Sequence, residues 1–237
     1  MRKKYTHLFF DLDNTLWDFK TNSLHALRTT FVELGLNQKS VRFEQFFEAY
    51  SVHNHNLWED YRNKKVRKAE LTRQRFQLTF DELGITGINA DEMNHRYLTE
   101  MPKQNHLEEG AIELLDDLKA KRYKLFIITN GFKEVQLKKM HTSGLQPYFE
   151  KVFISEEVKA PKPDPMIFEH AVKSTNAKKS CSLMLGDDWN VDIKGALNFG
   201  MDAIYYCPGT PASDSLGHGS SAKLISVSVL SDIMTVL

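Results

Sequence analysis

The sequence predicts an α/β protein in which an all-helical segment interrupts a parallel sheet with helices on both faces. Residues 5–10 form a short apolar and aromatic run, long enough for one buried strand and too short for a helix. Residues 18–103 then show helical periodicity without a strand signal. From Glu108 onward, helical patterns alternate with short apolar runs, which is typical of parallel strands joined by helical crossovers.

Four helical patterns fill the inserted segment. Asn22 or Ser23 is the expected N-cap of the first, and Asn89 or Asp91 that of the fourth, because these side chains accept hydrogen bonds from free N–H groups. Apolar residues at helical spacing place the four helices at residues 24–34, 43–61, 71–83 and 93–101.

The remainder of the chain alternates between the two periodicities. Helices are expected at residues 112–118, 135–140, 165–172 and 191–199. Strands are expected at residues 123–128, 152–154, 183–185 and 203–206, and residues 224–227 and 230–236 are expected to close the domain. Residues 208–221, rich in Gly, Ser and Pro, are expected to form a surface loop. The predicted domains are therefore a core of residues 1–17 and 104–237 and a helical segment of residues 18–103.

Two carboxylates follow the first apolar run directly. If the extended conformation persists, Asp11 and Asp13 point the same way, at the strand end where α/β sheets bind ligands. Two acids leaving a buried strand together are costly unless a metal or a shared proton relieves them. The alternative for this stretch alone is that both acids merely end the strand and cap the next turn.

Polar motifs also follow the next three apolar runs, in the order Thr129-Asn130-Gly131, Lys162-Pro163-Asp164 and Gly186-Asp187-Asp188 with Asp192. Together with the first pair of acids, this ordered set resembles the signatures of the haloacid dehalogenase superfamily. The resemblance covers the whole chain. It implies a Rossmann-like core and a helical cap inserted between the first and second motifs. On this resemblance we expect the chain to be a phosphomonoesterase.

In such an enzyme, carboxylates can act as nucleophile and as general acid–base. We expect Asp11 to form an aspartyl-phosphate, and Asp13 to protonate the leaving alkoxide and then activate water. The resemblance makes Lys162 the residue that neutralises the phosphoryl group. The hydroxyl of Thr129 and the N–H groups of Asn130 and Gly131 are expected to bind phosphoryl oxygens, although these three residues alone would also fit an ordinary turn.

A metal is expected at the same site. Like charges about 4 Å apart repel by roughly 4 kcal/mol at an effective dielectric near 20, so two aspartates and a phosphate dianion require a divalent cation. All-oxygen ligands favour Mg²⁺. The resemblance implies as ligands Asp11, the main-chain carbonyl of Asp13, and Asp187. Asp188 or Asp192 is a further ligand or a supporting partner, and the sequence leaves this choice open.

The helical segment resembles the cap of bacterial pyrimidine-nucleotide 5′-nucleotidases at residues 54–58, Tyr61 and Arg75, but Lys64 stands where a glycine is often found. This makes Asn54 and Trp58 candidate substrate-binding residues. Trp58 could stack on a base, but aromatic residues at helical spacing more often pack inward.

Composition narrows the choice of partners. Hydrophobic residues at 41% and charged residues at 26% describe an ordinary globular protein. The 31 basic and 31 acidic residues balance, which argues against a nucleic-acid polymer as partner and leaves a small phosphorylated metabolite as the expected one. No run is long enough to span a membrane, and Cys181 and Cys207 have no metal-ligand spacing. We expect a cytoplasmic protein, monomeric or homodimeric.

Several other functions share these motifs. A dehalogenase uses the same nucleophile but needs no acid at position 13, and phosphonoacetaldehyde cleavage needs a cap lysine for a Schiff base. Lys64, Lys65 and Lys68 instead resemble a solvated charge run. A sugar-phosphate phosphatase remains an alternative to a nucleotidase, and a phosphomutase would use the same core residues. A ligand-binding relic would be expected to have lost Asp11, Asp13 or Lys162.

Overall fold

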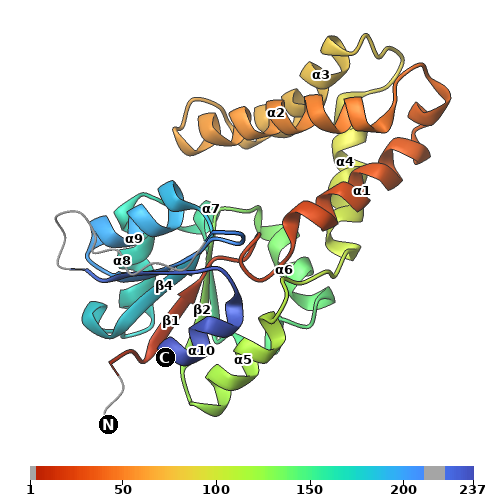
Figure 1. Cartoon of the computed structure of the whole chain (residues 1–237). Helices are drawn as coiled ribbons and strands as arrows, with labels where there is room; N and C mark the ends of the chain where they lie inside the picture. The colour runs from red at the N-terminus through yellow and green to blue at the C-terminus, as the bar shows by residue number, and fades with distance from the viewer. Residues whose placement is uncertain (1–3, 211–221) are drawn as a thin grey trace. The chain divides into compact units, whose positions relative to one another are not determined.

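A computed structural model of the protein describes residues 4–210 and 222–237 and contains one six-stranded sheet (Figure 1). Every neighbouring pair in it is parallel, and the strand order is β3-β2-β1-β4-β5-β6. The strands are β1 (His7–Phe10), β2 (Lys124–Thr129), β3 (Lys151–Ile154), β4 (Ser182–Gly186), β5 (Asp202–Tyr206) and β6 (Leu224–Val227). The expected α/β fold class is confirmed. Residues 211–221 of the expected surface loop lie outside the described residues.

Helices cover both faces of this sheet (Figure 1). The helices of the core unit are α5 (Ala111–Ala120), α6 (Lys133–Thr142), α7 (Ser155–Val158), α8 (Pro165–Ser174), α9 (Lys194–Phe199) and α10 (Ile233–Val236). Short 3₁₀ turns are η3 (Gln146–Tyr148), η4 (Lys179–Cys181) and η6 (Leu230–Asp232). On one face, Phe9 and Met184 pack with Phe168 of α8 and Ala196 of α9 in one buried cluster. Every residue of β1 and β4 is buried, which explains why the residues after His7 and after Ser182 do not alternate between apolar and polar.

β1 lies between β2 and β4, and this brings distant motifs to one edge of the sheet. Phe10 pairs with Ile127 on one side and Leu185 on the other, and the Asp11 amide still donates to the Leu185 carbonyl at 2.8 Å. All three strands are parallel, so the residues that follow them emerge at the same edge.

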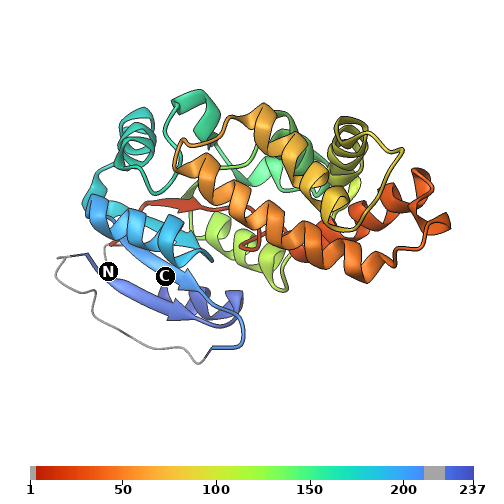
Figure 2. The same ribbon diagram turned by 90° about the horizontal axis from the view of Figure 1, so that it is seen from above.

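The helical segment is a compact unit of its own, formed by α1 (Phe19–Glu33), η1 (Leu36–Gln38), α2 (Phe43–Arg62), α3 (Lys68–Glu82), α4 (Ala90–Glu100) and η2 (Met101–Lys103). Figure 2 shows α2 and α3 side by side, as the orange helices. Aromatic rings fill its interior: Tyr50 of α2 stacks on Phe76 of α3 at 5.0 Å between centroids, and Tyr97 of α4 meets both edge-on.

The chain divides into Met1–Phe19 with His106–Leu237, and Lys20–Asn105. Among the described residues, no helix combines the length and apolar character needed to cross a membrane.

Two expected helix boundaries were wrong. α1 begins at Phe19, so Asn22 and Ser23 are not N-caps; both are buried, and the Ser23 hydroxyl lies 2.8 Å from that of Tyr97. The helix expected at residues 191–199 is also divided, because Trp189–Ile193 forms one π-helical turn (η5) before α9 begins at Lys194. The Asn89 cap is confirmed, since its side chain accepts from the amides of Asp91 and Glu92.

Candidate active site

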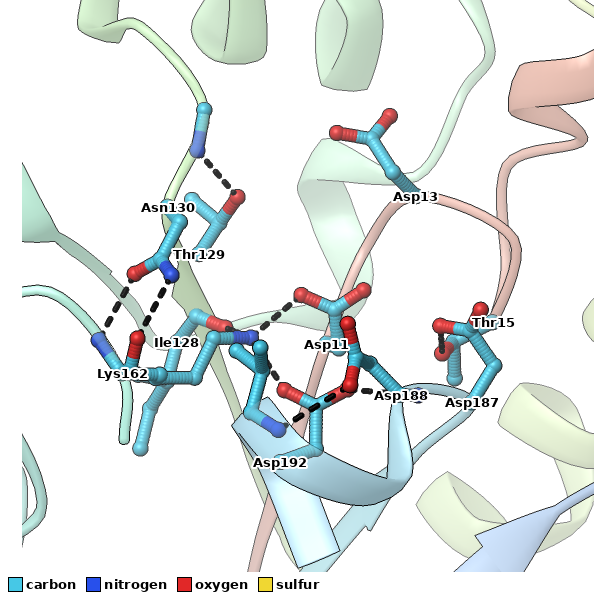
Figure 3. A network of polar contacts seen from close by, with 12 residues as sticks. Asp11, Asp13, Thr15, Ile128, Thr129, Asn130, Lys162, Asp187, Asp188 and Asp192 are labelled. Carbon is cyan, nitrogen blue, oxygen red and sulfur yellow. Dashed lines mark hydrogen bonds and ion pairs between the residues drawn. The ribbon is translucent and has the colours of Figure 1, made fainter. Parts of the chain in front are cut away.

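Lys162 joins two carboxylates inside the core unit. Its Nζ atom lies 2.5 Å from Asp11 Oδ1 and 2.6 Å from Asp192 Oδ1, and it donates to the Ile128 carbonyl at 2.7 Å (Figure 3). Lys162 is only 1% exposed, and Asp192 likewise. Burial alone would lower the pKa of Lys162, but the charges of Asp11 and Asp192 outweigh it and raise that pKa above its ordinary value. The lysine is therefore a permanent cation at the end of β1.

The carboxylates around this cation are short of compensating charge. Burial raises the pKa of Asp11 well above its usual value; Lys162 opposes this, whereas Asp192 and Asp187 add to it. The pKa of Asp187 is raised to about 7, chiefly by burial and to a smaller extent by the negative charge of Asp192. The pKa of Asp192 is raised as well, by burial first. One lysine thus faces three acids, and the site favours either protons or a further cation.

The same three acids could hold a metal ion. Asp11, Asp187 and Asp192 each offer one oxygen, and these atoms lie within 4.8 Å of one another. Carboxylate oxygens suit a hard cation such as Mg²⁺, and the raised pKa values indicate the unmet negative charge that such a cation would balance. Asp11, Asp187 and Asp192 are therefore suitable ligands for Mg²⁺.

Asp188 and Asp192, between which the sequence left the choice open, occupy different places. The Asp188 side chain caps η5, accepting from the amides of Asn190 and Val191 at 2.9 and 3.0 Å. The η5 turn brings Asp192 back over Gly186, where an added Cβ would lie 2.4 Å from Asp192 Oδ2. Gly186 therefore leaves the space that Asp192 needs beside Lys162. Asp187 receives a hydrogen bond from the Thr15 hydroxyl at 3.1 Å, a contact that sequence reasoning missed.

The Thr129-Asn130-Gly131 motif organises the edge next to β1. The Thr129 hydroxyl oxygen accepts from the Gly131 amide at 3.1 Å, so its own O–H remains available to donate. The Asn130 side chain holds the backbone of Lys162, accepting from its N–H at 2.8 Å and donating to its carbonyl at 3.0 Å. Asn130 thus positions the lysine through its amide group, a role that the turn-like sequence did not indicate.

Comparison with known proteins identifies the family of this chain. A model of the haloacid dehalogenase-like hydrolase family matches residues 8–206. The chain belongs to this family. It is 35% identical over 205 residues to the pyrimidine 5′-nucleotidase PynA of Streptococcus pneumoniae, covering 86% of this chain and 84% of that one. It is 32% identical over 199 residues to the pyrimidine 5′-nucleotidase YjjG of Escherichia coli, covering 84% of each chain.

A solved structure extends the match over the full length of this haloacid dehalogenase-like hydrolase. The Bacillus subtilis HAD-hydrolase YfnB, solved bound to magnesium, superposes with a TM-score of 0.85 at 25% identity, covering 99% of each chain. The resemblance that the sequence motifs indicated is confirmed, and with it the expectation of an enzyme.

Asp13 lies apart from the lysine cluster in this hydrolase, on the same loop as Asp11. Figure 3 shows its carboxylate turned away from Asp11 and Lys162. Two side chains of α6 hold it: Lys139 Nζ lies 2.6 Å from Oδ1, and Gln136 Nε2 donates to Oδ2 at 2.9 Å. Both were missed from the sequence. Their spacing of three residues places them on one face of a helix, which was the only available signal.

The helical unit contains a polar cluster around a buried arginine. Arg75 is 2% exposed, and its Nη1 donates to Asn54 Oδ1 at 3.2 Å while Nη2 donates to Asn94 Oδ1 at 2.5 Å. A guanidinium carries only donors, so Asn54 must turn its carbonyl oxygen toward Arg75 and its NH₂ group away. Trp58, one helical turn further along α2, is half-buried and meets Tyr61 edge-on at 5.6 Å.

Proposed function

We propose that this protein is a Mg²⁺-dependent phosphatase that hydrolyses pyrimidine nucleoside 5′-monophosphates through an aspartyl-phosphate on Asp11. The observation that carries the proposal is the Lys162 cluster. A phosphoryl group next to Asp11 would lie beside the Lys162 cation and beside carboxylates that could hold a metal ion. The two relatives named as pyrimidine 5′-nucleotidases support the substrate class.

The oxygen ligands proposed for the metal are Asp11, the main-chain carbonyl of Asp13, and Asp187. The bound cation would neutralise charge between the nucleophile and the phosphoryl group. Asp192, ion-paired to Lys162 on one oxygen, accepts from the Asp188 amide on the other at 3.2 Å. It is therefore a supporting partner or a further ligand, and Asp188 serves as the cap of η5.

In the first step, a carboxylate oxygen of Asp11 attacks phosphorus and the bond to the ester oxygen breaks. Asp13 gives its proton to the departing alkoxide, which leaves as the nucleoside. Lys162 and the Thr129 hydroxyl stabilise the charge that develops on the phosphoryl oxygens. The N–H groups of Asn130 and Gly131 were also expected there; in the resting structure Gly131 donates to Thr129 instead.

In the second step, Asp13 takes a proton from water, and the water oxygen attacks phosphorus. The bond between phosphorus and Asp11 breaks, inorganic phosphate is released, and both aspartates return to their starting states. Because Asp13 gives one proton and regains one, the cycle balances as hydrolysis.

Substrate choice must come from residues beyond this machinery, because the core contacts only the phosphoryl group. We propose that Asn54 and Trp58 supply it. The Asn54 NH₂ group, turned away from Arg75, would donate to the O2 carbonyl that all pyrimidines share, and Trp58 would stack on the base.

The test is to compare kcat/KM for UMP, dUMP and a hexose phosphate with saturating Mg²⁺, measuring released phosphate and nucleoside. The proposal predicts that both nucleotides are preferred, with equimolar nucleoside and phosphate as products. A preferred hexose phosphate would overturn the nucleotidase assignment and leave a sugar-phosphate phosphatase. Isomerised substrate without free phosphate would indicate a phosphomutase.

A further inference from the structure

The Asp13 carboxylate is held at both oxygens by one helix that supplies none of the residues proposed above. We infer that Lys139 is a positioning residue which, together with Gln136, fixes the orientation of the Asp13 side chain, and that the acid–base role of Asp13 depends on this support. This inference rests on the proposed function, because the contacts of Lys139 and Gln136 can affect catalysis only if Asp13 transfers protons.

Lys139 stands where a lysine is costly. It is 2% exposed, whereas Lys138 beside it on α6 is exposed to solvent. Burial disfavours its charge, and Asp13, the more distant Asp11 and two aromatic rings oppose this effect. Nζ lies 4.1 Å from the ring centroid of Trp17 and 5.3 Å from that of Phe19. Burying a charge is costly unless it is paired, so the contact with Asp13 is what keeps this lysine inside the protein.

Gln136 links Asp13 to the phosphate-binding motif. Its Nε2 carries two hydrogens, of which one goes to Asp13 Oδ2 at 2.9 Å and the other to Thr129 Oγ1 at 2.8 Å. An added Cβ on Gly131 would lie 2.4 Å from Gln136 Cδ. The absence of a side chain at Gly131 therefore leaves the space that the Gln136 side chain occupies. The proposed proton-transfer group and the proposed phosphate donor are thus held by the same side chain.

Removing the contact between Lys139 and Asp13 should have the kinetic effect of a partial loss of the Asp13 acid–base function. Lys139→Met should lower kcat at least about 10-fold with little change in KM, because the general acid–base that it positions contributes about 10²–10⁴-fold. The loss should be larger for UMP than for para-nitrophenyl phosphate, whose leaving group needs no protonation. Lys138→Met is the matched control and should keep wild-type kinetics.

The decisive experiment combines Lys139→Met with Asp13→Asn, using the full-length protein with Mg²⁺. If Lys139 acts through Asp13, its substitution should cost less than about 3-fold once Asp13→Asn is present. Equal losses in both backgrounds would make Lys139 a purely structural residue and overturn the inference. Full activity of Asp13→Asn alone would overturn the proposed mechanism, and this inference with it.

Gln136→Leu provides a second route that leaves the charge of α6 unchanged. It removes the hydrogen bonds to Asp13 Oδ2 and to Thr129 Oγ1. The loss that acts through Thr129 should affect UMP and para-nitrophenyl phosphate equally, whereas the loss that acts through Asp13 should be larger for UMP and should disappear in the Asp13→Asn background. If Lys139→Met does not fold, this variant decides the question alone: equal losses for the two substrates overturn the inference, and a larger loss for UMP that disappears in the Asp13→Asn background supports it.

Discussion

Lys162 Nζ lies 2.5 Å from Asp11 Oδ1, although 151 residues separate them in the sequence. The contact depends on β1 lying beside β2 in the sheet and on Asn130 fixing the Lys162 backbone with two hydrogen bonds. It places a buried cation at the proposed nucleophile before any substrate arrives, so the charge stabilisation is preorganised.

Lys162→Met should abolish turnover and destabilise the fold. Asp11 and Asp192 would be left buried without their cation, and breaking a buried ion pair costs about 3–5 kcal/mol. The penalty should be smaller at pH 5 than at pH 8, because both carboxylates can then be neutralised by protons. Urea unfolding at the two pH values measures this. Lys159→Met, at an exposed lysine nearby, is the control, and a pH-independent penalty for Lys162→Met would contradict the charge argument.

Asp11→Asn should remove activity and leave the fold intact. The amide keeps the size of the side chain, and Lys162 keeps Asp192 as its ion-pair partner. Losing the Asp11 charge also relieves repulsion from Asp192 and Asp187. Phosphate release from UMP and the thermal unfolding midpoint are the two measurements. Excess chelator should abolish wild-type activity, and added Mg²⁺ should restore it. Turnover that persists in chelator or in Asp11→Asn would exclude the proposed chemistry.

Metal-free protein should lose stability as the pH rises from about 4 to 7. The pKa of Asp187 is raised from 3.8 to about 7 in the folded state, so in this range the folded protein holds a proton that the unfolded chain has lost. One such group contributes a slope of at most about 1.4 kcal/mol per pH unit. Mg²⁺ replaces the protons, so it should stabilise the fold more at pH 8 than at pH 5.

Unfolding of metal-free protein across this pH range, in wild type and Asp187→Asn, measures the effect. The variant should show a shallower slope and a smaller stabilisation by Mg²⁺. Glu113→Gln, which removes one exposed acid, should behave as wild type. Parallel pH profiles for wild type and Asp187→Asn would refute the raised pKa of Asp187.

The sequence predicted what local patterns determine. Apolar runs located the strands, and the polar residue after each run located Asp11, Thr129 and Asp187 at one sheet edge. It did not predict contacts that depend on tertiary packing. Lys139 was missed because two adjacent lysines on a helix resemble a solvated face. The tertiary contacts of Lys139 with Asp13 and with the rings of Trp17 and Phe19 distinguish it from Lys138.

The choice between Asp188 and Asp192 was unpredictable for a related reason. A regular helix was expected after Asp188, but η5 is a π-helical turn, and its geometry sets which acid faces Lys162. The direction of the Asn54 amide likewise depends on Arg75, which lies 21 residues away on another helix.

Because the carbonyl oxygen of the Asn54 amide faces Arg75, the role of its NH₂ group can be tested without removing the contact with Arg75. Asn54→Asp keeps an oxygen for Arg75 and converts their hydrogen bond into an ion pair, so the helical unit should remain folded. The only group removed is the NH₂ donor, and a carboxylate there would repel a base carbonyl. We expect kcat/KM for UMP and dUMP to fall about 10-fold or more, since a lost hydrogen bond that leaves a polar group unpaired costs about 1–3 kcal/mol. The value for a hexose phosphate should change little.

Trp58→Ala completes the comparison, because stacking needs the indole ring whereas packing within the unit needs only its bulk. Stacking is worth about 1–3 kcal/mol per base, so kcat/KM for both nucleotides should fall about 5- to 150-fold, again sparing the hexose phosphate. Trp58→Leu should fold as wild type and still lose the nucleotide preference. If Trp58→Ala lowers all three substrates equally, Trp58 packs inside the helical unit and contributes nothing to base recognition, and substrate choice would then rest on the Asn54 donor alone.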